Sequence, residues 1–264
     1  MFMVIEISKG SWLRCPGCNN IQYRRTVEEN LNVCPECDHH FRIDAKTRIN
    51  YLVDKDSFQE ISNNLESNNP LKWIGYTKRL QTEKIKSRIR EAMKIGRAFI
   101  KGRAVMLAVM DSNFLMGSMG AVVGEKFCLA VEEAIEKSLP LVAVICSGGA
   151  RIHEGVVALD QMAKTSVALA KLDECGGLFI PVLTDPTTGG VAASFAMLGD
   201  VIIAEPGAMI GFAGPRTIAG TIKIKLPESF QTAEFLLEHG FVDMIVHRQD
   251  LRSEISRLID YCQK

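Results

Sequence analysis

Hydrophobic positions in the second half of the chain alternate between runs of strand length and helical stripes. Three apolar runs predict buried strands: Ala104–Met110, Leu141–Cys146 and Phe179–Thr184. Apolar residues at spacings of three and four predict the helices that follow them: Glu125–Lys137, Val156–Leu172 and Val191–Leu198. Two short strands and a C-terminal helical region complete the predicted core: Val201–Ala204, Met209–Phe212 and the segment from Thr232. Strands that alternate with helices indicate an α/β fold.

A basic segment precedes this region. Between Lys72 and Arg103 there are eleven Lys and Arg residues but only two acids, Glu83 and Glu91. The four-residue spacing of Ile85, Ile89 and Met93 predicts a helix over Glu83–Ile95 that ends at Gly96. Two interpretations stay open: a surface for a polyanionic ligand such as a nucleotide or coenzyme A, or a solvated helix. The segment before it, Tyr51–Asn69, is polar and predicts a short helix and a loop.

Two glycine-rich turns follow predicted strands. Ser147-Gly148-Gly149-Ala150-Arg151 follows one strand, and Asp185-Pro186-Thr187-Thr188-Gly189-Gly190 follows the next. Glycine lets a backbone approach a ligand closely, and a helix N-terminus presents free N–H groups. Together they predict oxyanion holes, which stabilise negative charge that develops on a carbonyl oxygen. The nearby glycines Gly117 and Gly120 add to this prediction.

Side-chain catalytic motifs are scarce in the sequence. It contains no G-x-S-x-G nucleophile motif, no phosphate loop of the G-x-x-x-x-G-K-[ST] type and no G-x-G-x-x-G motif after a strand. His153 and Glu154 are the one plausible acid–base pair, and a structural role at a helix start is the alternative. The pattern therefore favours chemistry by backbone amides.

Four of the eight cysteines form two C-x-x-C knuckles near the N-terminus: Cys15, Cys18, Cys34 and Cys37. Two such knuckles supply the four tetrahedral ligands of a structural zinc ion, with no coordination position left for catalysis. Two disulfides or a redox C-x-x-C pair are the alternatives. We expect one zinc ribbon over residues 1–48 and a second domain over residues 49–264.

Composition restricts the classes of function. The chain of 264 residues has 31 Lys and Arg against 31 Asp and Glu, so net charge gives no support for binding nucleic acid or membranes. The longest apolar runs fall short of the ~18 residues of a membrane helix, and the first residues lack the basic start of a signal peptide. We therefore expect a cytoplasmic protein, with weak nucleic-acid binding through the ribbon as an alternative.

Longer motifs carry a family resemblance that spacing alone does not supply. Besides the four-cysteine ribbon and the two glycine turns, they are Met116-Gly117-Ser118-Met119-Gly120-x-x-x-Gly124, Gln161-Met162-Ala163-Lys164-Thr165-Ser166, Leu183–Val191, Ser194-Phe195-Ala196-Met197-Leu198-Gly199-Asp200 and Ile210-Gly211-Phe212-Ala213-Gly214-Pro215-Arg216. In this order, over nearly the whole chain, they resemble the β subunits of bacterial acetyl-CoA carboxylase carboxyltransferases.

The resemblance implies a crotonase-like ββα superhelix and a transfer of the carboxyl group from carboxybiotin to acetyl-CoA. It also implies partners: a carboxyltransferase α subunit in a heterotetramer of two α and two β subunits, the biotin carboxyl carrier protein and biotin carboxylase. The amides of Gly189 and Gly190 would hold the biotin ureido oxygen as catalytic groups. Residues expected to bind the acyl-CoA are Gly148, Gly149, Ala150, Arg151, Gly117 and Gly120.

Two alternatives belong to other functional classes or reactions. One is an acyl-CoA decarboxylase component of the same fold, and the other is a nucleic-acid-binding regulator that acts through the zinc ribbon. Ile152-His153 departs from the Met-Gln that is common in the family, and this leaves the acyl preference open.

Overall fold

The computed structural model describes residues 10–214, 218, 220, 221, 223, 227 and 229–262. The chain divides into two compact units, residues 1–43 and 44–264. The boundary expected after residue 48 falls inside helix α2 (Ala45–Leu52), which belongs to the second unit. This helix begins where the Asp44 carboxylate accepts the N–H of Thr47 at 2.6 Å, so an N-cap lies at the observed boundary.

The first unit contains a small hairpin and one short helix. Strands β1 (Trp12–Arg14) and β2 (Ile21–Tyr23) pair antiparallel and lead into α1 (Arg24–Glu29). Val27 and Val33 are fully buried together with Cys15 and Cys34, so two cysteines and two valines form the interior of this unit.

The second unit is built on one eight-stranded sheet within the described residues. Its order is β10-β8-β7-β6-β5-β4-β3, and β9 pairs with β7 beside β8. The strands are β3 (Gln59–Ile61), β4 (Met93–Ile100), β5 (Arg103–Met110), β6 (Leu141–Ser147), β7 (Phe179–Thr188), β8 (Ile203–Ala204), β9 (Ile210–Gly211) and β10 (Met244–Ile245). The β5–β10 pairs are parallel, whereas β3 and β4 are antiparallel additions at one edge.

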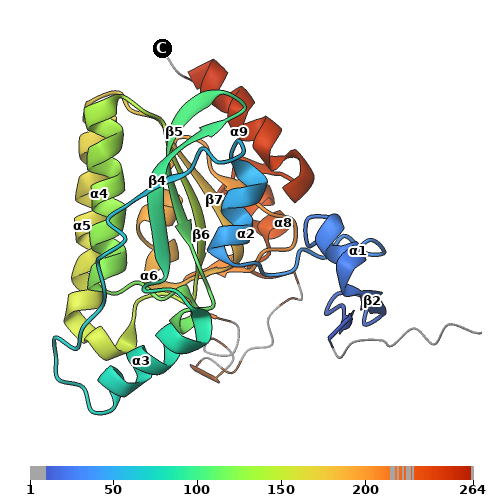
Figure 1. Cartoon of the computed structure of the whole chain (residues 1–264), viewed down its shortest axis with the longest axis horizontal. Helices are drawn as coiled ribbons and strands as arrows, with labels where there is room; N and C mark the ends of the chain where they lie inside the picture. The colour runs from blue at the N-terminus through green and yellow to red at the C-terminus, as the bar shows by residue number, and fades with distance from the viewer. Residues whose placement is uncertain are drawn as a thin grey trace, which may run out of the picture. The chain divides into compact units, whose positions relative to one another are not determined.

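Helices cover both faces of this sheet. Figure 1 shows α4 (Ala121–Lys137) and α5 (Gly155–Glu174) side by side on one face, with α2 and α9 (Arg248–Cys262) on the other. The remaining helices are α3 (Tyr76–Ser87), α6 (Gly189–Ala192) and α8 (Ala233–Glu238), with short 3₁₀ turns η1 (Leu115–Gly117), η2 (Ile152–Glu154) and η3 (Phe195–Met197). The predicted α/β class is confirmed.

The apolar run of β5 explains this layering. Met106, Ala108 and Met110 pack in the core shared with α4, whereas Val105, Leu107 and Val109 pack in the core shared with α2 and α9. Successive side chains of a strand point to opposite faces, so a strand covered on both sides needs a continuous apolar run. Glycine-rich turns at the ends of such strands are therefore held on a rigid base.

The prediction of a helix over Glu83–Ile95 is wrong. Helix α3 ends at Ser87, Arg88 adopts a left-handed conformation with φ 59°, and Met93 begins β4. Ile85 is 80% exposed, so the four-residue spacing does not mark a buried stripe. Gly96 lies inside β4, where a Cβ would come within 2.4 Å of the Gln59 carbonyl oxygen. It permits close pairing with β3 rather than ending a helix.

Other expectations are corrected in extent. The single helix expected at Val191–Leu198 is replaced by α6 and the turn η3, which are separated at Ser194. The Ser194 hydroxyl donates to the Gly190 carbonyl at 2.7 Å, and this local bond competes with a continuous helix. The polar segment Tyr51–Asn69 contains the end of α2 and the unexpected strand β3. No helix among the described residues is long and apolar enough to cross a bilayer.

Candidate functional site

The two glycine turns lie next to each other at one edge of the sheet. They follow β6 and β7, which are parallel neighbours, so both turns leave the same end of the sheet. A Cβ built on Gly149 would lie 3.1 Å from the Gly189 Cα, and one built on Gly189 would lie 2.9 Å from the Gly149 Cα. Both residues have positive φ, +109° and +63°. Only glycine allows this approach of two backbones.

Two of the four predicted amides are free to bind a ligand. Ala150 and Gly190 donate to no acceptor among the described residues, and their turns are in contact. The amide of Gly189 instead donates to the Phe212 carbonyl at 2.8 Å, and that of Gly149 donates to the Ser147 hydroxyl at 3.0 Å. Of the four predicted donors, one N–H in each turn thus has no acceptor in the described part of the chain.

Gly117 and Gly120 support the turns through close packing. A Cβ on Gly117 would lie 2.1 Å from the Cys146 carbonyl oxygen, and one on Gly120 would lie 2.5 Å from both Glu154 carboxylate oxygens. Both glycines are buried. Gly148, by contrast, is exposed, and its amide donates to the Met116 carbonyl at 2.8 Å. Gly117 and Gly120 thus permit close packing around the turn, and their expected contacts with a ligand stay a prediction.

Arg151 occupies a buried network instead of facing a ligand. Its Nη2 lies 2.6 Å from a Glu91 oxygen, and its Nη1 lies 3.1 Å from a Glu154 oxygen. Ser67, Ser118 and the Ser118 carbonyl accept from the same guanidinium. The side chain is 1% exposed, so it positions the turn and has no donor left for a substrate. These contacts favour a positioning role for Arg151 over the expected contact with the acyl-CoA, which stays a prediction.

Glu91 and Tyr76 complete this network, and sequence reasoning missed both. Burial opposes ionisation of Glu91, but the charge of Arg151 and hydrogen bonds outweigh it and lower the pKa. Tyr76 donates to Glu154 at 2.6 Å, and burial raises the pKa of its hydroxyl. Glu91 carried a signal, because it is one of two acids in the basic segment. Tyr76 carried none.

His153 and Glu154 do not form an acid–base pair. Glu154 is buried and accepts from Tyr76, from Arg151 and from the Ala121 amide at the start of α4. His153 stacks on the Tyr76 ring at 4.9 Å, with its Nε2 3.3 Å from an Arg79 nitrogen. Partial burial and the Arg79 charge lower the pKa of His153. The structural alternative is confirmed for Glu154.

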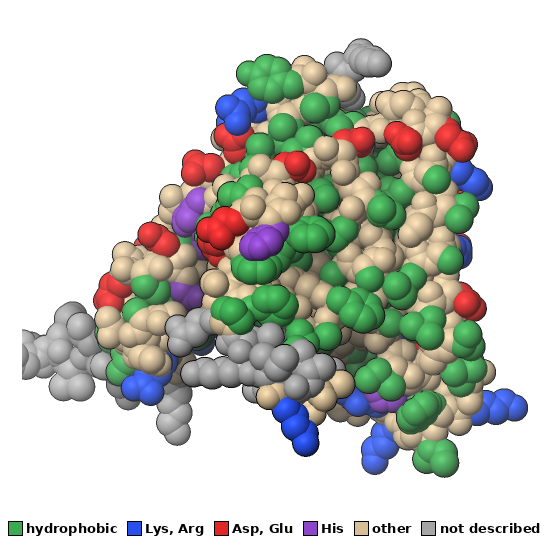
Figure 2. Space-filling model, turned by 180° about the vertical axis from the view of Figure 1, so that it is seen from behind, with side chains coloured by type: hydrophobic (Ala, Val, Ile, Leu, Met, Phe, Trp, Pro, Cys, Tyr) green, Lys and Arg blue, Asp and Glu red, His purple; other side chains and the backbone are tan. Residues whose placement is uncertain are grey.

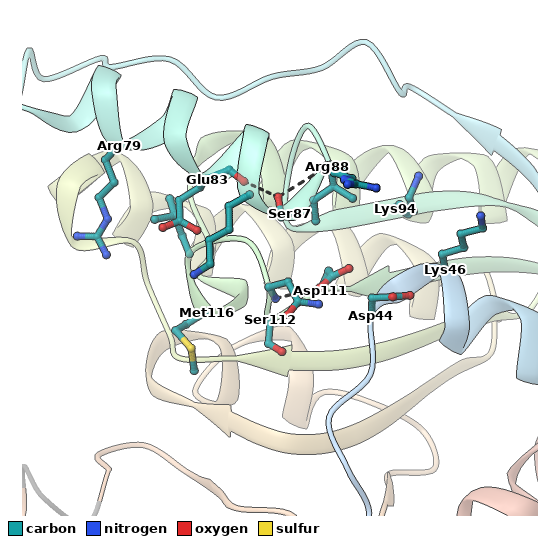
Figure 3. Close-up of a pocket in the computed structure, with 14 residues that line it drawn as sticks. Asp44, Lys46, Arg79, Glu83, Ser87, Arg88, Lys94, Asp111, Ser112 and Met116 are labelled. Atoms are coloured by element: carbon teal, nitrogen blue, oxygen red, sulfur yellow. Dashed lines mark hydrogen bonds between the residues drawn. The ribbon is translucent and has the colours of Figure 1, made fainter. Parts of the chain in front are cut away.

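A cavity of about 800 Å3 opens beside the first turn. Figure 3 shows Arg79 and Glu83 of α3 along one side, with Arg88 just after this helix. Lys46 of α2 and Asp44, which precedes α2, lie at another side, and Ser112 and Met116 lie on the loop that follows β5. Met116 links the cavity to the turn through its carbonyl bond to Gly148. Three acidic residues line the cavity, against five basic ones, which are Lys46, Arg79, Lys86, Arg88 and Lys94. Helix α3 and strand β4 thus bring the basic segment to a cavity, although its predicted single helix does not exist.

The first unit holds a second site, formed by the four N-terminal cysteines. All four sulfur atoms lie within 4.8 Å of one another, with Cys15–Cys37 at 3.5 Å and Cys18–Cys34 at 4.0 Å. A tetrahedral zinc ion about 2.3 Å from each sulfur would place the sulfurs about 3.8 Å apart. All eight cysteines are free, so the disulfide alternative is not supported.

The two knuckles share one backbone geometry. In each, the first cysteine accepts from the residue four positions on, and donates to the residue five positions on: Cys15 with Asn19 and Asn20, Cys34 with Asp38 and His39. A Cβ on Gly17 would lie 3.1 Å from the Cys37 sulfur and 3.0 Å from the His39 Cβ. Glycine therefore lets the knuckles approach closely enough to share one ion.

Family models match both units. A model described as Carboxyl transferase domain matches residues 42–259. The chain belongs to the carboxyl transferase family. A model described as Acetyl-CoA carboxylase zinc finger domain matches residues 12–37. The fold is accordingly crotonase-like with an N-terminal zinc ribbon, as the resemblance implied.

Curated members of the family match almost the whole chain. Two of them, both named acetyl-coenzyme A carboxylase carboxyl transferase subunit beta, come from Desulforamulus reducens and Clostridium botulinum (strain Kyoto / Type A2). The first is 53% identical over 96% of this chain and 88% of its own length. The second is 54% identical over 97% of this chain and 89% of its own length.

Solved structures show the same fold. The 12S transcarboxylase with bound methylmalonyl-coenzyme A superimposes with a TM-score of 0.71 at 26% identity, over 83% of this chain and 41% of that one. A Pseudomonas malonate decarboxylase heterodimer gives a TM-score of 0.65 at 21% identity, over 83% of this chain and 86% of that one. The decarboxylase is evidence for the fold alone. Pro215 and Arg216, at the end of one quoted motif, lie outside the described residues.

Replacement of one buried cysteine tests the metal site of this family member. We expect the wild-type chain to carry about one zinc ion, because four thiolates complete its coordination. Cys34→Ser should lose the ion and unfold the first unit, since metal binding supplies much of the folding free energy of such a small unit. Metal analysis of the purified protein, together with thiol titration under native conditions, measures both effects.

Cys175→Ser is the matched control, because Cys175 is exposed and lies outside the cluster. It should keep the full zinc content. Wild-type Cys15, Cys18, Cys34 and Cys37 that react freely with a thiol reagent in the folded protein would contradict the four-thiolate site.

Proposed function

We propose that this chain is the β subunit of an acetyl-CoA carboxylase carboxyltransferase and acts in the cytoplasm. The product would be malonyl-CoA for fatty acid biosynthesis. The observation that carries the proposal is the pair of free amides, Ala150 and Gly190, on two adjoining turns. Identity of 53–54% to carboxyltransferase β subunits over nearly the whole chain supports this reaction over decarboxylation, whose structural relative reaches only 21%.

The chemistry needs stabilised oxygen anions more than it needs titrating side chains. The carboxyl group passes from the biotin nitrogen to the methyl carbon of acetyl-CoA, and the methyl proton passes to the biotin nitrogen. While this exchange takes place, negative charge develops on two carbonyl oxygens, the ureido oxygen of biotin and the thioester oxygen. The Gly190 amide would donate to the first, and the Ala150 amide would donate to the second. Acyl preference depends on other groups.

The cavity beside Met116 would hold the coenzyme A. Its volume of about 800 Å3 lies within the ~300–1,000 Å3 of ligand sites. Its excess of basic side chains suits the phosphates of a nucleotide. The bond from Gly148 to Met116, which lines the cavity, supports an orientation with the thioester end of the ligand toward the turns.

An α subunit would cover helix α5 in a heterotetramer of two α and two β subunits. Val156, Leu159 and Val167 are more than half exposed at helical spacing on α5. Figure 2 shows hydrophobic side chains over the part of the second unit that carries α4 and α5. Exposed apolar stripes of this kind mark interfaces. The carboxyl donor would be biotin on its carrier protein, charged by biotin carboxylase.

Gly149→Ala tests the amide site in the reconstituted enzyme. The new Cβ would push the two turns apart and add a left-handed strain of about 1–2 kcal/mol. We expect kcat for carboxyl transfer to fall about 10²–10³-fold, the loss typical of one oxyanion donor. The assay combines this chain with an α subunit, carboxybiotin carrier and acetyl-CoA, and follows malonyl-CoA.

Gly176→Ala is the matched control for backbone strain. Gly176 has a φ of +70°, and its Cβ would meet nothing within 4 Å. It should lose similar stability but keep kcat. Equal loss of kcat in both variants would contradict the amide site. Robust carboxyl transfer by the isolated chain would contradict the requirement for an α subunit. Loss of CO2 from malonyl-CoA without a biotin partner would favour the decarboxylase alternative.

Neutralising the cavity tests the coenzyme A assignment. Lys46→Gln with Lys86→Gln removes two exposed cations that line it. We expect the Kd for coenzyme A to rise roughly tenfold, about 0.7 kcal/mol for each exposed charge. Titration calorimetry of the full chain measures it at low salt. Lys55→Gln, exposed and outside the cavity, should leave the Kd unchanged, and an unchanged Kd in the double variant would place coenzyme A elsewhere.

We also propose weak single-stranded nucleic-acid binding by the ribbon, because of one exposed face. Trp12, Arg14, Ile21 and Tyr23 lie exposed on the β1–β2 hairpin, with the Trp12 and Tyr23 rings 5.3 Å apart as a cross-strand pair. Aromatic rings offer stacking surfaces for bases, and arginine offers contacts to phosphate. Arg24 and Arg25 extend the positive charge at the end of the hairpin.

Binding of a single-stranded RNA to the full chain tests this second function. Trp12→Ala should weaken binding by about 1–3 kcal/mol, the usual contribution of one stacked base. Arg14→Gln should reduce the salt dependence by about one charge. Lys55→Gln in the second unit is the control. Absence of binding at low salt would remove this function.

A further inference from the structure

A second, smaller cavity lies between β4 and α4. It has a volume of about 220 Å3, and its lining residues include Glu60 of β3 and Lys126 of α4. This volume is below the ~300–1,000 Å3 of sites for drug-sized ligands, so it suits a small group rather than a whole nucleotide. It shares Arg88, Ile89 and Lys94 with the larger cavity but has its own inner residues, Glu91, Met93 and Lys126. Figure 3 shows Arg88 and Lys94 near one another in the larger cavity.

Lys126 is an unusual lining residue because it is a buried cation. The residue is 2% exposed, and its Nζ donates to the Met93 carbonyl at 3.0 Å, its one hydrogen bond among the described residues. An ammonium has three N–H donors, so two are left for a ligand. No carboxylate of the described part of the chain lies within ion-pair distance of it. A buried charge without a partner is costly, which favours a bound anion.

The charges that face this cavity leave a positive excess. Four cations line it: Arg88, Arg90, Lys94 and Lys126. Two acids line it, but both have partners, since Glu60 binds Lys94 at 2.8 Å and Glu91 binds Arg151 at 2.6 Å. Arg90 lies 3.5 Å from Glu66, which Lys84 also contacts at 2.7 Å. Arg88 makes no side-chain hydrogen bond to a described residue, so its charge is available together with that of Lys126.

We propose that this cavity is a subsite for a small oxyanion of the phosphate class, separate from the site proposed for coenzyme A. Lys126 would donate from the inner wall, and Arg90, which does not line the larger cavity, would donate from the rim. Glu91 joins the cavity to Arg151, so the bound anion would lie one ion pair from the turn of Ala150. The proposal goes beyond carboxyl transfer and does not depend on it.

Inorganic phosphate is the probe, titrated calorimetrically into the full chain at constant ionic strength with chloride as the balancing ion. We expect saturable binding of about one phosphate per chain, because the cavity holds one small group. Lys126→Met, which keeps the length of the side chain, should weaken binding roughly tenfold or more, the loss of one charge-assisted hydrogen bond. Arg90→Gln should do the same and, at an exposed position, leaves the fold intact.

Arg97→Gln is the matched control, since Arg97 is an exposed arginine of β4 outside the cavity. It should bind phosphate as the wild type does, and saturating coenzyme A should not displace the phosphate. The proposal is overturned if phosphate does not bind, if Arg90→Gln binds it as tightly as Arg97→Gln, or if coenzyme A competes for the site. Because the readout is binding by this chain alone, failure of carboxyl transfer leaves the result interpretable.

Discussion

The ion pairs of Arg151 are the interaction on which the candidate site depends. The guanidinium binds Glu91 just before β4, Ser67 in an earlier loop, Ser118 after η1 and Glu154 at the end of η2. Five donors and two carboxylates are satisfied without water, which offsets the large desolvation cost of burying them. Arg151 directly follows Ala150, and backbone bonds from Arg151 to Met119 and from Met119 to Gly149 hold the Ala150 backbone on both sides.

The sheet supplies the second half of this construction. Parallel pairing of β6 with β7 brings both turns to one edge, and positive φ at Gly149 and Gly189 lets their backbones touch. The side chains at this edge serve to position backbone groups: Ser147 accepts the Gly149 amide, and Glu154 accepts the amide that begins α4. Preorganised donors of this type need no reorganisation when charge develops.

The sequence predicted most of the buried elements but not the packing of charged ones. Apolar runs such as Leu141–Cys146 and the stripe of α4 were sufficient, because burial on both faces determines them. The helix prediction for residues 83–95 was wrong, because Ile85, Ile89 and Met93 have helical spacing although Met93 and Ile95 are alternate buried positions of a strand. The partners of Arg151 lie 60 residues away at Glu91 and 75 at Tyr76, and no local pattern reveals such contacts. The same limit hid that Gly149 and Gly189 have occupied amides.

The paired free amides at Ala150 and Gly190 have a chemical consequence for the whole molecule. A backbone N–H has no proton to lose in the physiological range, and no alkylating or oxidising reagent converts it to another group. The proposed amide site would therefore be insensitive to the redox state and acidity of its surroundings, whereas the four thiols in the other unit respond to both. Groups that resist chemical modification and groups that are open to it thus lie in separate units of one chain.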